Sequence, residues 1–176
     1  VYALDRHGNP LLGWPVLINE SFQFAPALAD INDDQQNEVV IVSTDPPRFH
    51  ALRADGFDLP GWPVSPPKGF MLKSSPVIGD VNGDNKPDVV AILHGVTALA
   101  ATTGDLSQLG GVMAWNGDGS PIDLSPGPDA SALIVESVGV NRFKAAPPVL
   151  TDLDQDGFLD VVAASIDDYA YPTSIA

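Results

Sequence analysis

Three stretches of the chain place oxygen-bearing side chains at the same alternating positions. Each stretch is nine residues long and has Asp, Asn or Glu at positions one, three, five and nine. Ca²⁺ binds six to eight oxygen ligands, which include carboxylates, amide oxygens and backbone carbonyls. Because alternate side chains of a tight loop can turn toward one point, the spacing predicts three calcium-binding loops.

The candidate ligands lie at equivalent positions of the three stretches, and the residue at position seven contributes its backbone carbonyl. They are Asp30, Asn32, Asp34, Gln36 and Glu38 in the first loop, Asp80, Asn82, Asp84, Lys86 and Asp88 in the second, and Asp152, Asp154, Asp156, Phe158 and Asp160 in the third.

Position six of such a loop favours a residue that accepts a left-handed backbone. Gly157 supplies it in the third loop and Asn85 tolerates it in the second, whereas Gln35 in the first carries a steric cost. We therefore predict that calcium affinity decreases from the third loop to the second and then to the first.

Other interpretations of the loops fit less well. An EF-hand needs a bidentate Glu at position twelve, but that position holds Ile41, Ala91 and Ala163. Mg²⁺ prefers to keep its waters. A single Asp-rich loop is typical of a turn or a solvated acidic patch, yet three equivalent copies favour a metal. Because crowded carboxylates repel one another, we expect calcium to stiffen the loops and not to catalyse a reaction.

The loops belong to repeated strand units that must position them. Each loop follows a short Pro-containing strand and continues into an apolar strand such as Val39–Val42. A second unit, a strand, a Gly turn and a strand ending in Gly-Trp-Pro-Val, occupies 2–16 and 50–64, and 112–119 is a copy without the Trp-Pro ending. Four-stranded propeller blades recur every 40 to 50 residues or so. The two units together predict an all-β fold, a β-propeller with blades of four antiparallel strands.

The chain holds about three blade-equivalents in this scheme. The expected boundaries are 1–20 for the end of one blade, 21–66 for a blade, 67–145 for a blade with insertions, and 146–176 for the start of the next. The insertions, 98–109 and 123–141, are variable surface loops or recognition loops. Propellers close with typically four to eight blades. We therefore expect a fragment of a larger propeller; assembly of several copies, or completion by another chain, are the alternatives.

The composition limits the partners. The chain has 23 acidic and 8 basic residues, and its net charge of -15 repels nucleic acids and anionic membrane surfaces. It contains no cysteine, so disulfides and thiol chemistry are excluded. No apolar run has the roughly 18 to 20 residues of a membrane helix, and we expect no membrane insertion.

Residues that suggest catalysis have simpler interpretations. His7, His50 and His94 show neither paired spacing nor a nucleophile motif, so we interpret them as surface or strand histidines. Trp14 and Trp62 both precede Pro at equivalent positions, which favours packing between neighbouring blades over a sugar-stacking platform. Repeated Asp at metal spacing is a poor candidate for a glycosidase acid and base. We predict that the chain is not an enzyme.

The Asp-x-Asn/Asp-x-Asp-x-x-x-Asp-Val-Val pattern, preceded by a Pro-containing strand, resembles the FG-GAP repeats of integrin α-subunit propellers and their bacterial VCBS relatives. The Gly-Trp-Pro-Val endings resemble the bacterial branch. The resemblance covers nearly the whole chain outside the two insertions. It implies a propeller with calcium in the loop between the first two strands of each blade.

The resemblance also implies a class of function. We expect a secreted or cell-surface module for adhesion or ligand binding, with a protein or carbohydrate partner on the loop face and the remaining blades supplied by the same or another chain. The alternative is the accessory or catalytic propeller of a secreted polysaccharide lyase or hydrolase. Extracellular calcium, at millimolar concentration, suits loops of modest affinity.

Overall fold

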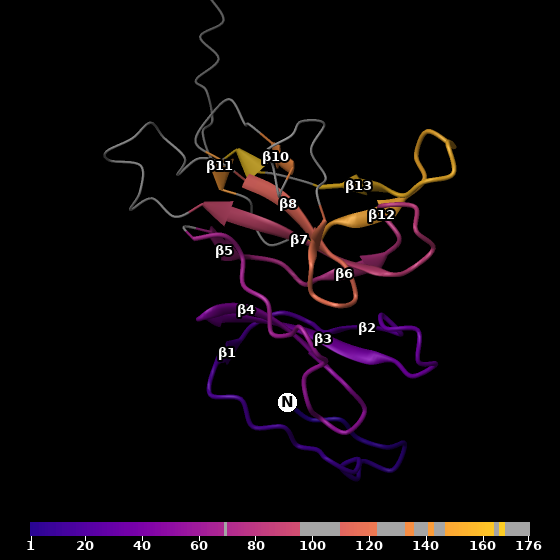
Figure 1. Ribbon diagram of the computed structural model, residues 1–176. Helices are drawn as coiled ribbons and strands as arrows, with labels where there is room; N and C mark the ends of the chain where they lie inside the picture. The colour runs from indigo at the N-terminus through magenta and orange to yellow at the C-terminus, as the bar shows by residue number, and fades with distance from the viewer. Residues whose placement is uncertain are drawn as a thin grey trace, which may run out of the picture.

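The computed structural model describes residues 1–68, 70–95, 110–122, 133–135, 141–142, 147–163 and 166–167. All regular secondary structure within these ranges consists of β-strands, and all paired strands are antiparallel (Figure 1). No helix in the described ranges is long and apolar enough to cross a membrane. The all-β expectation is confirmed, and none of the sheets formed by the described strands closes on itself.

Two sheets form the centre of the molecule, each around one long strand. The first sheet contains β1 (Ser21–Phe22), β2 (Ala27–Ala29), β3 (Glu38–Asp45) and β4 (Pro47–Leu52), and β3 pairs with the other three. The second contains β5 (Phe70–Leu72), β6 (Val77–Gly79), β7 (Asp88–Gly95), β8 (Gly110–Trp115), β9 (Pro121–Ile122) and β10 (Leu133–Val135). Two strand pairs follow: β12 (Val149–Thr151) with β13 (Asp160–Val162), and β11 (Asn141–Arg142) with β14 (Ile166–Asp167).

The sheets stack in the order of the chain, beginning with a hairpin formed by residues 1–16 (Figure 1). Successive side chains of a strand point to opposite faces, so β3 contributes to two cores. Ile41 packs with Trp14 on the side of the N-terminal hairpin, whereas Val40 and Val42 pack toward the second sheet. Burial on both faces explains why the sequence of β3 is an apolar run rich in β-branched residues.

A tryptophan joins each hairpin to the sheet that follows it. The indole Nε1–H of Trp14 donates to the carbonyl oxygen of Ala54 at 3.0 Å, and that of Trp62 donates to Gly117 at 2.9 Å. Ala54 and Gly117 occupy the same place, directly before the Asp-Gly pair of a hairpin turn. Both indoles are buried. We call this contact the tryptophan latch; it confirms that the tryptophans pack between neighbouring repeats.

His50, on β4, is buried between two carboxylates. Its Nδ1 lies 3.1 Å from Asp58 Oδ1 and its Nε2 lies 3.0 Å from Glu20 Oε2, while Arg48 Nη1 donates to Glu20 Oε1 at 3.0 Å. Burial by itself lowers the pKa of the imidazole, but the hydrogen bonds and charges of Asp58 and Glu20 outweigh burial and raise the pKa above its usual 6.5. The cluster ties the segment before β1 to β4 and to Asp58, in the connection that follows β4.

The predicted insertions fall largely outside the described residues. All of 98–109 lies outside them, and of 123–141 only β10 and Asn141 are described. β10 pairs with β8, so part of the second insertion extends the second sheet.

A comparison of Ala substitutions at Gly56 and at Gly8 measures how tightly the latch packs. Both have a φ of +84°, but a Cβ at Gly56 would lie 2.6 Å from Val16 Cγ2 and 2.8 Å from the Gly13 carbonyl oxygen, whereas a Cβ at Gly8 would meet nothing within 4 Å. Both Ala substitutions incur the left-handed strain of ~1–2 kcal/mol. Gly56→Ala should cost a further ~1–3 kcal/mol by overpacking. Urea unfolding measures this difference, and equal losses for the two variants would contradict the latch.

The His50 cluster predicts a pH effect on stability. Because the folded state holds the imidazole proton more tightly than the unfolded chain, the cluster stabilises fully below about pH 6.5 and less as pH rises through the folded pKa. The difference in free energy of unfolding between the wild type and His50→Gln should therefore shrink as pH rises above 6.5. Denaturant titrations at several pH values measure it; a constant difference would show that His50 is neutral in the fold.

Candidate metal loops

The three acidic loops connect equivalent strands. They join β2 to β3, β6 to β7 and β12 to β13, and all three project from the same side of the stack (Figure 1). The side chain at position nine belongs to the first residue of the second strand in each case: Glu38, Asp88 or Asp160. The end of the loop is therefore fixed by strand pairing.

The carboxylate at position nine closes each loop. It accepts a hydrogen bond from the backbone N–H of position two, and the same bond occurs in all three copies. The pairs are Ile31 N to Glu38 Oε2 at 3.0 Å, Val81 N to Asp88 Oδ2 at 3.0 Å, and Leu153 N to Asp160 Oδ2 at 2.8 Å.

The carboxylate at position one spans the turn. One of its oxygens accepts from the N–H of position six, which adopts a left-handed backbone as expected from the sequence. The pairs are Asp30 with Gln35 (φ 67°, 2.7 Å), Asp80 with Asn85 (φ 63°, 2.8 Å), and Asp152 with Gly157 (φ 94°, 3.1 Å). Gln35 adopts this conformation despite its steric cost.

Position four is also left-handed, a conformation that the spacing of the acidic residues does not predict. Asp33, Gly83 and Gln155 have φ values of 63°, 80° and 65°. Gly83 adopts this conformation without a steric cost, and Asp adopts it more readily than most other side chains, whereas Gln gives no sequence signal for it. The two left-handed residues turn the backbone N–H groups of the loop inward, toward the carboxylates.

The side chains at positions three and five bind the same turn. Asn32 and Asn82 accept from the N–H of position five at 2.9 Å. Position five in turn accepts from the N–H of position seven, at 2.8 Å for Gln36, 2.9 Å for Lys86 and 2.9 Å for Phe158. Every residue predicted as a ligand thus takes part in at least one hydrogen bond within its own loop.

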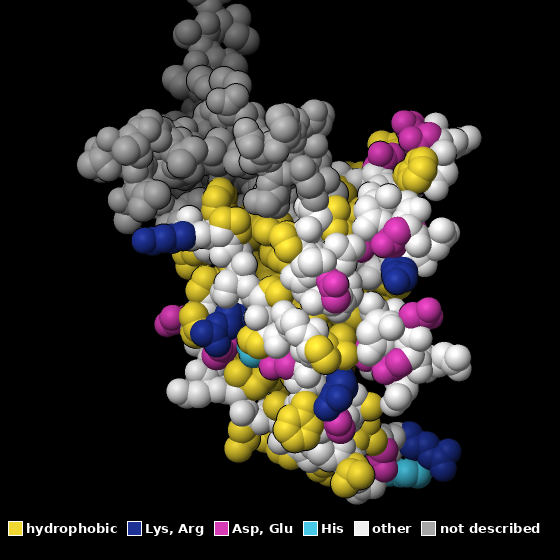
Figure 2. Space-filling model, in the orientation of Figure 1, with side chains coloured by type: hydrophobic (Ala, Val, Ile, Leu, Met, Phe, Trp, Pro, Cys, Tyr) yellow, Lys and Arg dark blue, Asp and Glu magenta, His cyan; other side chains and the backbone are white. Residues whose placement is uncertain are grey.

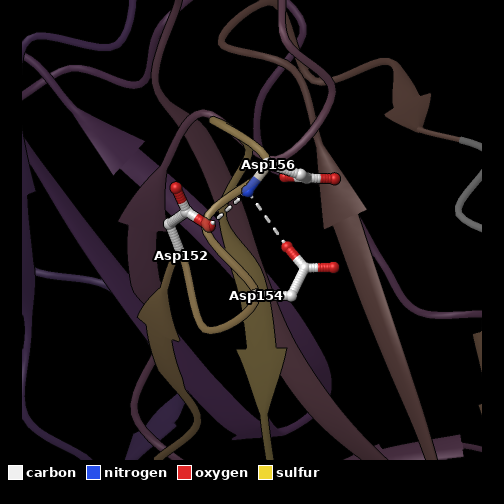
Figure 3. A group of neighbouring side chains, drawn as sticks. All are labelled: Asp152, Asp154 and Asp156. Carbon is white, nitrogen blue, oxygen red and sulfur yellow. Dashed lines mark hydrogen bonds between the residues drawn. The ribbon is translucent and has the colours of Figure 1, made fainter.

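The third loop brings three carboxylates together. The N–H of Asp156 donates to Oδ1 of both Asp152 and Asp154 at 3.1 Å (Figure 3). One oxygen from each of the three side chains lies within 4.8 Å of the other two. Within the described ranges this is the one such group of acidic or histidine side chains, because the first two loops have Asn at position three.

Position nine is buried and incompletely hydrogen-bonded in the first two loops. Glu38 and Asp88 are 1% and 0% exposed, and Glu38 Oε1 and Asp88 Oδ1 have no hydrogen-bond partner. Burial, together with the charges of Asp84 and Asp80, raises the pKa of Asp88 to about 6. Burial and the acidic side chains of its own loop likewise raise the pKa of Glu38.

This donor set fits a hard cation. A buried carboxylate oxygen without a partner is expensive, and it sits in a loop whose other carboxylates raise its pKa and therefore oppose its ionisation. A bound cation would satisfy the oxygen and neutralise the repulsion. Carboxylate and amide oxygens without histidine or thiolate are the ligands that Ca²⁺ prefers.

A cleft lies beside the first two loops. Its volume is about 520 Å³, and its walls include Asp34, Asp84, Lys86 and Asp118. Asn82 Nδ2 donates to Asn116 Oδ1 at 3.2 Å and so links the second loop to the turn that forms the far wall. The cleft thus opens between the two loops and the turn that receives the second latch.

The histidines lie apart from the loops. His7 is in the exposed turn of the N-terminal hairpin, and His94 is on β7. Both ring nitrogens of His50 face carboxylates, so neither is available as a base toward a hydroxyl nucleophile. His50 was expected to be a strand or surface residue; it is a strand residue and is buried.

Comparison with known proteins gives one match. Residues 30–91 match the model of the family described as FG-GAP-like repeat. No curated protein and no solved structure matches the chain. The matched residues contain the first two acidic loops, β3, β4, the second latch tryptophan Trp62, and the start of β7. The segment 30–91 is therefore similar to FG-GAP-like repeats.

Proposed function

We propose that the three loops bind Ca²⁺ and that the metal stiffens a propeller segment of the FG-GAP type. The observation that carries this proposal is the unpartnered Oδ1 of Asp88, which is fully buried in a loop where Asp80 and Asp84 oppose its ionisation. A cation removes both penalties at once. Glu38 Oε1 repeats the arrangement in the first loop.

Equivalent residues of the three loops would hold the metal. The side chains at positions one, three, five and nine and the carbonyl at position seven supply oxygens, and the bound ion supplies charge compensation. The three carboxylates grouped in the third loop favour the highest affinity there, in line with the predicted order.

The module is proposed to bind a partner outside the cell and to be non-catalytic. The net charge of -15 disfavours nucleic acids and anionic membranes. The cleft beside the first two loops offers a concave surface for a protein or carbohydrate ligand. The remaining blades would come from the same or another chain. Millimolar extracellular calcium would keep loops of modest affinity occupied.

Calcium titration tests the metal proposal. Calorimetry of the chelator-treated chain should show binding with Kd values in a range of roughly 10⁻⁴–10⁻³ M, typical of extracellular modules, and calcium should raise the melting temperature. Combined Asp152→Asn and Asp156→Asn, at the two positions that hold Asp in all three loops, should remove one site and leave the others. Asp33→Asn is the matched control, because it makes the same change at a loop position that is not a predicted ligand. No heat and no effect of chelator on melting would contradict the proposal.

The raised pKa of Asp88 predicts how pH acts on the metal-free chain. The folded state keeps the proton of Asp88 up to about pH 6, whereas the unfolded state releases it near 3.8. Stability in chelator should therefore fall as pH rises from about 4 to 6, by up to ~3 kcal/mol. Asp88→Asn should remove this part of the pH dependence, and calcium should reverse the loss in the wild type. Parallel stability curves for the wild type and the variant would argue against a buried, strained carboxylate.

A further inference from the structure

The N-terminal hairpin repeats the hairpin formed by residues 49–64 with an offset of 48 residues, bond by bond. The turn of each hairpin is closed by a hydrogen bond from its glycine N–H, and the later copy at 110–122 has the same bond. The three are Gly8 N to Asp5 O at 3.0 Å, Gly56 N to Arg53 O at 2.9 Å, and Gly119 N to Asn116 O at 2.9 Å. Arg6, Ala54 and Gly117 are therefore equivalent residues.

The turns of the second and third copies are covered by the preceding repeat. Their carbonyls at Ala54 and Gly117 accept the indole N–H of a latch. A Cβ on Gly119 would lie 2.6 Å from the Gly61 carbonyl oxygen and 3.0 Å from Val64 Cγ1, which matches the surroundings of Gly56. Each covering segment is thus the Gly-Trp-Pro-Val end of a hairpin.

The equivalent surface of the first copy is open. A Cβ on Gly8 would meet nothing within 4 Å. Leu4 is 53% exposed, whereas its equivalents Leu52 and Trp115 are 1% and 2% exposed beneath their latch tryptophans. Tyr2 is exposed as well, and Figure 2 shows hydrophobic side chains at the lower end of the molecule, where the N-terminal hairpin lies.

We propose that the turn Asp5–Gly8 together with Leu4 is a docking site for the Gly-Trp-Pro-Val end of another repeat of this type, whose indole N–H donates to the Arg6 carbonyl. This occupant is expected because the chain already forms the same interface twice, at Ala54 and at Gly117. A second copy of the described residues does not offer a free Gly-Trp-Pro-Val end. Trp14 and Trp62 are both engaged in latches, and the hairpin at 110–122 lacks the motif, since it continues as Ser120-Pro121-Ile122. The proposal concerns an interaction surface and does not depend on calcium in the loops.

A tethered segment tests the docking site in the full chain. The ten residues 57–66, which contain Gly61-Trp62-Pro63-Val64, are appended to the N-terminus through a flexible Gly/Ser linker of about 12 residues, which spans roughly 20 Å. The backbone amide that replaces the amino group of Val1 can still donate to the Val16 carbonyl, as Phe49 N donates to Val64. The tether keeps the local concentration of the segment high.

The readout is the appended tryptophan, observed by ¹⁵N NMR. Its indole N–H should exchange with solvent at least roughly fivefold more slowly than in the free ten-residue peptide, the factor that corresponds to a net hydrogen bond of ~1 kcal/mol. The amide resonances of residues 4–8 should shift at the same time. The experiment is run in calcium and in chelator, so that failure of the metal proposal and failure of docking are separate results.

Two substitutions locate the contact. Leu4→Glu should abolish the protection, because it places a charge where Leu52 and Trp115 are buried. Leu12→Glu should leave the protection intact, because Leu12 is 95% exposed and its equivalent, Pro60, is also exposed. An appended segment with phenylalanine in place of tryptophan should lose the shifts that report on the Arg6 carbonyl. Absence of protection, or equal protection in the Leu4 and Leu12 variants, would overturn the proposal.

Discussion

The hydrogen bond from each latch tryptophan to the next turn is the contact through which the sheets and the acidic loops depend on one another. Trp62 donates to Gly117 and lies in the apolar cluster between the two sheets. Gly117 in turn lies so close to the first loop that a Cβ on it would collide with the Ile31 carbonyl oxygen. The N–H of Ile31 donates to Glu38, the residue that closes the first loop. One line of contacts therefore runs from the core between the sheets to a candidate metal ligand.

The carboxylates at position nine of the first two loops are kept buried by the elements around them. Burying a carboxyl group with one oxygen unpartnered is unfavourable. Glu38 and Asp88 are held in that condition by strand pairing on one side and by packing on the other. The loop cannot relax by moving its last residue into solvent, because that residue begins β3 or β7. A bound cation would thus relieve an unfavourable burial that the fold itself maintains. In the first loop, its effect would reach the interface between the sheets through Ile31.

The sequence indicates the local chemistry well and the long-range contacts poorly. Alternating acidic residues predicted the loop geometry, since Asp30, Asp80 and Asp152 all accept from position six as a tight turn requires. The repetition of Trp14 and Trp62 predicted that they pack between repeats. The acceptor of Trp62, in contrast, is 55 residues away in the sequence, and no local pattern designates a particular carbonyl. The left-handed conformation of Gln155 was missed because Gln gives no sign of that backbone, and that of Asp33 because Asp adopts it only occasionally. Burial of His50 was also missed, since it depends on Glu20 and Asp58 arriving from separate segments.

The two latches tolerate very different lengths of intervening chain. Trp14 and its acceptor are 40 residues apart, whereas Trp62 and its acceptor are 55 apart. Most of the difference lies between the long strand and its partner: β3 and β4 are joined by one residue, but residues 96–109 separate β7 from β8. The closure entropy of a flexible connection grows only slowly with its length. The latch therefore forms in the same way whether one residue or 14 residues join the long strand to its partner, so the length of this connection does not set the geometry of the latch.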